Sequence, residues 1–247
     1  MNNEKKQRLE EAIAAIQREY GQDTIRPLAD SSAGSVVPPL STGFMILDEA
    51  LRGGILRGSL TELHGVGASG LATVAFRVLA NAQEAGDTAV YIDLSRSFHR
   101  NYAVHCGVNV STLTMARPDN KHQEENTRQG LSFIHDVITL ACAGIVVLDF
   151  GTNLPPSGQE AARQIRAISG LLAHSDIALL VLHSFSEKFS DPFARQASVR
   201  LRFENQGWIK HINDVRGWQS NVTIQKSRLT PAGRVVNILI KLPRTAP

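Results

Sequence analysis

One glycine-rich segment constrains this chain more than any other part of its sequence. Residues 65–72 read Gly-Val-Gly-Ala-Ser-Gly-Leu-Ala, which keeps the glycine spacing of the phosphate-binding pattern G-x-x-x-x-G-K-[ST]. In that pattern the Lys reaches the β- and γ-phosphates and the hydroxyl ligates Mg²⁺. Here Leu71 occupies the Lys position and Ala72 the Ser/Thr position. The sequence therefore predicts a loop of phosphate-binding shape, the glycine loop, without its cation and its metal-ligating hydroxyl.

The residues on either side of the glycine loop favour a strand before it and a helix after it. Residues 60–64 alternate as in a β-strand, and residues 73–80 have helical spacing with no breaker before Gly86. An ordinary glycine turn before a helix is the alternative interpretation. Further along, apolar strands alternate with helical segments, which is typical of a mostly parallel sheet covered on both faces. The predicted fold class is α/β, with an N-terminal helical arm and antiparallel strands near the C-terminus.

Several segments, in the same order and spacing, resemble RecA, the bacterial recombinase. Residues 41–48 resemble the family's STG…LD segment, residues 53–65 its lead into the phosphate-binding loop, and residues 145–149 its Walker B strand. Residues 197–201 match a late RecA strand. The resemblance implies a RecA-like core over residues 41–247. Its degenerate nucleotide-binding positions fall on Gly65, Gly70, Leu71, Ala72 and Asp149.

Other positions with roles in RecA-type ATPases also differ here. By alignment, Ser95 stands where an acidic residue activates the attacking water, and Phe150 follows Asp149 where the family has a hydroxyl. The polar pair that senses the γ-phosphate falls on His183 and Ser184. Because a positioned general base contributes about 10²–10⁴-fold to a rate, we expect no catalytic residues, no enzyme activity and no ATP–Mg²⁺ cofactor. The loop backbone alone leaves weak nucleotide binding open.

A divergent NTPase that has relocated its missing cation is the enzymatic alternative. Arg57, Arg96 or Arg100 would then have to reach the phosphates, and no motif supports any of them. Thr73 offers a hydroxyl one residue beyond the expected position, but one helical residue rotates it by about 100°.

The net charge of +3 is unevenly distributed along the chain, and the C-terminal region is basic. Residues 195–247 carry ten Lys or Arg against two acidic residues, a charge of +8 that leaves −5 for the rest. Basic strands with aromatic residues among the charges can bind nucleic acid, so a DNA-binding module is another alternative. A solvated sheet edge, with charges that discourage aggregation and with tryptophans in the core or in subunit contacts, is the structural interpretation. The residues expected to contact DNA are Trp208, Lys210, Arg216, Lys226 and Arg228.

The first thirty residues predict an amphipathic helix that ends at Gly21. Residues 31–40, with Ser, Gly and Pro, read as a linker. The resemblance to RecA implies that residues 1–30 form an arm that docks on a neighbouring protomer, whereas folding back on its own core is the alternative. The partner-binding residues are Leu9, Ile13, Ile16 and Tyr20, which recur at intervals of three and four.

These features favour a protein that acts by binding other proteins in DNA repair, recombination or damage-induced mutagenesis. The ImuA type of RecA-related protein, associated with translesion mutagenesis, has similar Gly-Gly and G.L.EL segments. The resemblance implies RecA or a second copy as the partner of the arm, with a translesion polymerase and DNA as further partners. An SOS or DNA-damage response is the setting that this implies.

The sequence favours a cytoplasmic protein without metal or membrane partners. No apolar run approaches the roughly 18 residues that cross a bilayer, and the N-terminus is charged rather than signal-like. Cys106 and Cys142 lie far apart, without the spacing of metal ligands, and we expect both to be buried, reduced thiols.

Overall fold

The computed structural model describes residues 2–21, 37–119, 122–153, 156–184, 192–211 and 214–242. The chain divides into two compact units, Met1–Val37 and Pro38–Pro247. Most of the predicted linker at 31–40, and the part of the arm after Gly21, lie outside the described residues.

Helix α1 (Asn2–Tyr20) makes up most of the described part of the first unit. It ends where predicted, because Gly21 adopts a φ of +100° and its N–H donates to the carbonyl of Gln17 at 3.0 Å. A positive φ is costly for residues with a Cβ and open to glycine. The sequence prediction of an N-terminal helix is confirmed.

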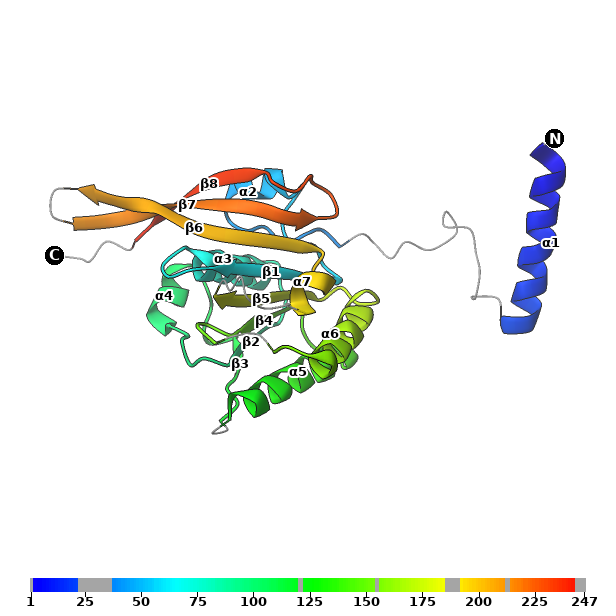
Figure 1. The fold of residues 1–247 in the computed structure, drawn as a ribbon, viewed down its shortest axis with the longest axis horizontal. Coiled ribbons are helices and arrows are strands. Elements are labelled where there is room, and N and C mark those ends of the chain that lie inside the picture. The colour runs from blue at the N-terminus through cyan, green and yellow to red at the C-terminus, as the bar shows by residue number, and fades with distance from the viewer. Residues whose placement is uncertain are drawn as a thin grey trace. The chain divides into compact units, whose positions relative to one another are not determined.

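The second unit is built on one eight-stranded sheet with the order β3-β2-β4-β5-β1-β6-β7-β8 (Figure 1). Strands β1 to β6 pair in parallel, and β6, β7 and β8 pair antiparallel. This arrangement confirms the predicted α/β class. The strands are β1 (Ser59–Gly65), β2 (Ala89–Asp93), β3 (Thr114–Ala116), β4 (Ile145–Asp149), β5 (Ala178–Ser184), β6 (Val199–His211), β7 (Asp214–Ser227) and β8 (Val235–Lys241).

Helices cover both faces of this sheet (Figure 1). The hydrophobic cluster on one face includes most of α3, and the cluster on the other face includes the inner sides of α5 and α6. Strands β2 and β4 are buried along their whole length, as parallel strands covered on both faces should be. The helices are α2 (Met45–Ala50), α3 (Leu71–Glu84), α4 (Arg100–His105), α5 (Gln123–Thr139), α6 (Gln159–Leu172) and α7 (Pro192–Gln196).

The hairpin formed by β6 and β7 is longer than the sequence predicts. Alternation predicts strands only at 199–203 and 222–225, whereas the paired strands run for 13 and 14 residues. The pairing register shifts between Asn205 and Gly207, which breaks the alternation while the backbone pairing continues. Strand β6 pairs with β1 only up to Phe203, so the hairpin extends beyond the parallel part of the sheet (Figure 1).

Two further comparisons with the sequence concern cysteines and membranes. Cys106 is buried, as expected, but Cys142 is exposed because it follows the end of α5 rather than lying within a strand. Among the described residues, no helix combines the length and the apolar character that crossing a bilayer would need.

Candidate functional site

The glycine loop lies at the carboxyl edge of the sheet, between β1 and the first turn of α3. Gly67 and Gly70 adopt φ values of +60° and +97°, which favour glycine. A Cβ at Gly70 would also lie 2.2 Å from Cδ1 of Ile240 in β8. The second glycine of the pattern is therefore required both by backbone conformation and by close packing against the C-terminal strands.

The side chains at the Lys and Ser/Thr positions pack on the protein interior. Leu71 and Ala72 are half-buried in the first turn of α3 and contact the hydrophobic cluster on that face. The nearest hydroxyl along the helix, that of Thr73, lies 2.6 Å from the hydroxyl of Tyr102. Thr73 is therefore buried in a contact with α4.

The C-terminal strands hold the glycine loop from one side. The side-chain amide of Asn205 donates to the carbonyl of Ala68 at 2.9 Å, and the buried hydroxyl of Ser220 donates to the carbonyl of Ser69 at 2.6 Å. Sequence reasoning missed both residues, because neither belongs to a motif. A cavity of about 460 Å³ lies between the loop and β6, and its lining is Gly65, Val66, Arg202, Phe203, Glu204, Asn205 and Gln206.

Asp149, at the Walker B position, ends β4 with its carboxylate engaged inside the protein. It accepts from the Tyr91 hydroxyl at 2.6 Å, the Ser97 hydroxyl at 3.2 Å and the N–H of Gly151 at 2.7 Å. Burial raises the pKa of Asp149, and burial also raises the pKa of Tyr91, with the nearby carboxylate adding to the effect.

A second carboxylate lies beside Asp149, because Asp93 ends the neighbouring strand in the same register. It accepts from the N–H groups of Ser97 and Phe98 and from Nε of Arg117 at 3.1 Å. Ser95, at the position of the water-activating acid, donates to the Ser97 hydroxyl at 2.7 Å. A chain of hydrogen bonds therefore connects the Ser95 position to Asp149 through Ser97.

Two of the three arginines considered as relocated cations have other partners, and the third, Arg100, is exposed at the start of α4. Arg57 lies before β1, at the amino edge of the sheet, where it pairs with Asp87 at 2.5 Å. Arg96 forms an ion pair with Asp119. Among the described residues, no group of three or more His, Cys, Asp or Glu side chains has the arrangement of a metal site.

One of the two positions that the resemblance to RecA assigns to γ-phosphate sensing, His183, belongs to a buried polar cluster that sequence reasoning did not foresee. Nε2 of His183 lies 2.8 Å from Oε1 of Glu62, whose other oxygen lies 3.0 Å from Nε of Arg200. His64 stacks on His183 with ring centroids 5.8 Å apart, and its Nε2 lies 2.8 Å from Oε1 of Gln225. Burial, and then the positive charge of Arg200, lower the pKa of His64 to about 4.

Ser184, the other sensing position, turns towards a neighbouring loop. Its hydroxyl donates to the carbonyl of Gly151 at 3.0 Å, just beyond the end of β4. This bond ties the ends of β4 and β5 together at the carboxyl edge.

Of the residues predicted to contact DNA, three lie on the distal part of the hairpin, whereas Lys226 and the exposed Arg228 lie at the other end of β7. Trp208 is 51% exposed and packs edge-on against Trp218, which is only 6% exposed, and Lys210 and Arg216 lie on the same distal part of the hairpin. Lys226, in contrast, donates to the carbonyls of Ala194 and Arg195 at 3.1 and 3.0 Å. The structure therefore groups the first three predicted residues and gives Lys226 a structural contact elsewhere.

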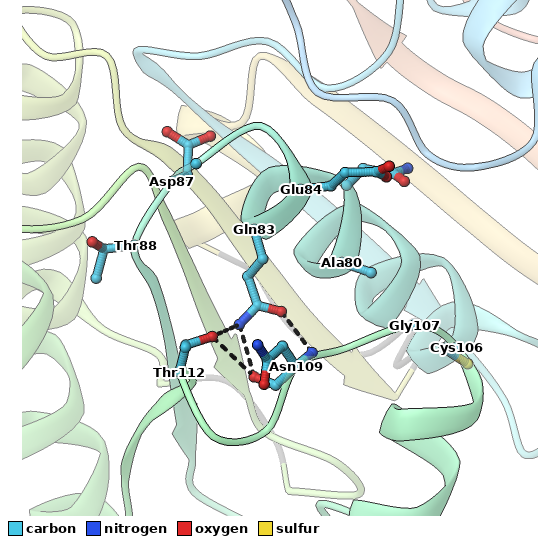
Figure 2. Close-up of a pocket in the computed structure, with 11 residues that line it drawn as sticks. Ala80, Gln83, Glu84, Asp87, Thr88, Cys106, Gly107, Asn109 and Thr112 are labelled. Atoms are coloured by element: carbon cyan, nitrogen blue, oxygen red, sulfur yellow. Dashed lines mark hydrogen bonds between the residues drawn. The ribbon is translucent and has the colours of Figure 1, made fainter.

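A larger cavity, of about 660 Å³, lies at the far end of α3 (Figure 2). The Gln83 side chain spans it, donating to the Asn109 carbonyl at 2.9 Å and to the Thr112 hydroxyl at 3.1 Å. None of the residues predicted for nucleotide, partner or DNA binding lines this cavity.

Comparison with known proteins identifies the relatives of this fold and site. The family described as the RecA N-terminal domain matches residues 7–177. Protein RecA of Chlorobium chlorochromatii is 26% identical over 94% of this chain and 72% of its own length. Protein RecA of Aquifex aeolicus is 28% identical over 93% of this chain and 72% of its own length. The crystal structure of the RadB recombinase superposes with a TM-score of 0.61, covering 80% of this chain and 94% of that chain at 20% identity.

The sheet order, the strand–loop–helix at its carboxyl edge and these matches define a RecA-like protein. The chain belongs to the RecA N-terminal domain family. This relationship supports a RecA-like role in DNA recombination or repair.

The prediction that the chain is not an enzyme is wrong in the light of these relatives. They are named RecA and RadB, which are ATPases, although 26% identity does not by itself make this chain one. The prediction rested on a few side chains, mainly Leu71 and Ala72, whereas a nucleotide site draws on groups from several elements. The absence of a bound cofactor and the resemblance to the ImuA type remain predictions.

Proposed function

We propose that this protein works in DNA recombination or repair by binding RecA, or another copy of itself, through helix α1. One observation carries the proposal. Within the unit Met1–Val37, the predicted contact residue Leu9 is 60% exposed, and Ile13 and Ile16 are half-buried. The apolar stripe of α1 is therefore only partly covered inside its own unit.

The physical chemistry of this helix favours a bound state. Tertiary packing of an apolar face supplies most of the stability of helices in proteins. Full burial of a Leu or Ile side chain contributes about 1.5–3 kcal/mol, so docking the stripe formed by Leu9, Ile13 and Ile16 stabilises both the helix and the complex. Charged residues cover the opposite face, which orients the stripe towards the partner.

The test uses purified full-length chain and purified RecA in a pulldown, with sedimentation to follow self-association. The double variant Ile13→Glu with Ile16→Glu should lose binding. Its matched control, Gln7→Glu with Ala15→Glu, adds the same charge on the other side of the helix and should bind normally. Undiminished binding after deletion of residues 1–30 would refute the role of α1. A translesion polymerase is tested as partner in the same pulldown.

A specific observation also favours DNA binding as a second candidate function. The exposed ring of Trp208 lies on the distal hairpin with Lys210 and Arg216, and stacking on an aromatic ring contributes about 1–3 kcal/mol per base. Binding of single-stranded DNA should weaken steeply with added salt. At a fixed salt concentration, Trp208→Ala should bind single-stranded DNA more weakly than the parent chain. Arg234→Ala should bind as the parent chain does, because Arg234 lies at the other end of the hairpins. Equal affinity of both variants and the parent chain would exclude this site.

A further inference from the structure

The last strand of the sheet leaves a long backbone edge open. Among the described residues, β8 (Val235–Lys241) pairs only with β7, and its seven residues contain no proline and no register shift. Proteins normally protect such edges with bulges, prolines, inward charges or a covering element. The opposite edge strand, β3, has only three residues. Strand β8 is therefore the longer of the two edges that the sheet offers for pairing.

The hydrogen bonds at both ends of β8 show which of its backbone groups point outward. Ile224 donates to the carbonyl of Arg234, and Leu242 donates to the carbonyl of Arg216, so the even-numbered residues face β7. Successive residues of an antiparallel strand direct their N–H and C=O groups to opposite sides. The outward groups consequently belong to the odd-numbered residues, which are Val235, Asn237, Leu239 and Lys241.

Apolar side chains accompany this open backbone. Val235 and Leu239 are 52% and 45% exposed, and α2, which packs against β8, exposes 78% of Met45 and 46% of Ile46. Single exposed apolar residues are ordinary on protein surfaces. Two of the four, Val235 and Leu239, lie on the exposed face of the open edge strand itself, which favours pairing of that edge with another chain.

We propose that two copies of this chain associate by antiparallel pairing of β8 with β8 about a two-fold axis at Ile238. The two eight-stranded sheets then become one sheet of sixteen strands, 8 + 8. Asn237 lies opposite Leu239 of the second copy, and Val235 lies opposite its Lys241. Four outward residues in each strand each form two hydrogen bonds with the residue opposite, which gives 4 × 2 = 8 bonds between the copies.

The strand is complementary to itself in this register, which is why a second copy is the occupant. The positive charge of Lys241 lies opposite Val235 rather than opposite another Lys, so like charges are not paired. On the other face, where the side chains of Val236, Ile238 and Ile240 are buried within each copy, Ile238 lies opposite itself and Val236 opposite Ile240, so no charges are paired there either. A shift by two residues reduces the four outward pairs to three. A two-fold axis closes the assembly at two copies, and α1 takes no part in it.

Molar mass in solution tests the pairing. Sedimentation equilibrium of the full chain should approach twice 26.9 kDa. Asn237→Pro removes an outward N–H and the side-chain bond to Asn221, while leaving the backbone bonds between β8 and β7. Leu239→Lys adds charge at the centre of the edge, and both variants should sediment as monomers. Gln219→Lys, a matched control on β7 opposite Leu239, should remain dimeric. A monomeric parent chain at about 100 μM, or dimeric edge variants, would overturn the proposal.

Disulfide formation tests the register and separates it from association through α1. Residues in a hydrogen-bonded antiparallel pair have Cα atoms about 5.5 Å apart, within the range of about 4.4–6.8 Å for disulfides. In a Cys142→Ser background, which removes the exposed native thiol, a mixture of Asn237→Cys and Leu239→Cys chains should cross-link faster than either chain alone. Equal rates would contradict this register. The same pair of cysteine chains should cross-link normally when both also carry Ile13→Glu and Ile16→Glu. Loss of cross-linking in those chains would show that the copies associate through α1 instead.

Discussion

The pKa of His64 leads to a quantitative prediction about stability in mild acid. Its pKa falls from 6.5 to about 4 in the folded protein, because burial and Arg200 disfavour the charged ring. One pKa unit corresponds to about 1.36 kcal/mol, so the difference of about 2.5 units is worth about 3 kcal/mol. This is a large part of the stability of an ordinary domain.

The sign follows from which state binds the proton. Above pH 6.5 the ring is neutral in both states and contributes no pH dependence. Between pH 6.5 and 4 the unfolded chain takes up a proton that the folded protein does not, so stability falls by up to about 1.4 kcal/mol per pH unit. Below pH 4 the His64 ring is protonated in both the folded and the unfolded state, and its whole contribution to the free energy of unfolding has been lost. The groups around the ring are Arg200, Arg202, His183 and Gln225.

Urea unfolding at pH 7.0, 6.0, 5.0 and 4.5 measures this contribution by difference. His64→Gln removes the titrating ring and should lose less stability than the parent chain as the pH falls. Ile224→Val, a buried variant without a titrating group, should lower stability by about 0.5–1.5 kcal/mol equally at every pH. Parallel pH profiles for the parent chain and His64→Gln would refute the argument.

Three further predictions concern the glycine loop and the hairpin. Gly70→Ala should destabilise by about 1–3 kcal/mol through its positive φ and its contact with Ile240, and Ile240→Val should reduce this cost in a double-mutant cycle of urea unfolding. Ser220→Ala leaves a buried loop carbonyl without its donor, so unfolding should show a loss of about 1–3 kcal/mol, and hydrogen exchange should speed up in the glycine loop. Trp218→Ala should cost about 3–5 kcal/mol, whereas Trp208→Ala, at the exposed ring, should change the melting temperature little.

The parallel core could be predicted because its signals are local. Strands such as 145–149 are short apolar runs next to turn residues, and the helix after the glycine loop has uninterrupted helical spacing. The RecA-like order of segments then indicated a mostly parallel sheet with antiparallel strands near the C-terminus, and the strand order came from the structure. The hairpin was underestimated because a register shift near Asn205 interrupts the period of two that sequence patterns detect.

The candidate site was less predictable because its contacts span the chain. Ser220 bonds to a residue 151 positions earlier, and Asn205 bonds to one 137 positions earlier. The hydroxyl of Tyr91, in β2, donates to the carboxylate of Asp149 at the end of the adjacent strand β4. Sequence patterns indicated which positions would meet a nucleotide in RecA, but not which neighbours hold those positions in place. The wrong prediction about enzyme activity came from the same limitation, since it judged a multi-element site from a few residues.

The loop and the edge of the sheet are connected through one residue. Ile240 packs on Gly70 with its side chain, while its neighbours Leu239 and Lys241 turn their backbone groups to the open edge. Ordering of β8 by a second copy would therefore also restrict the side chain that holds the start of α3. Because local opening of an edge strand depends on the bonds it makes, the pairing proposed for β8 would be coupled to the conformation of the glycine loop through Ile240. A ligand that binds the glycine loop would then change the association constant of the two copies by some factor. Association of the copies would change the affinity for that ligand by the same factor.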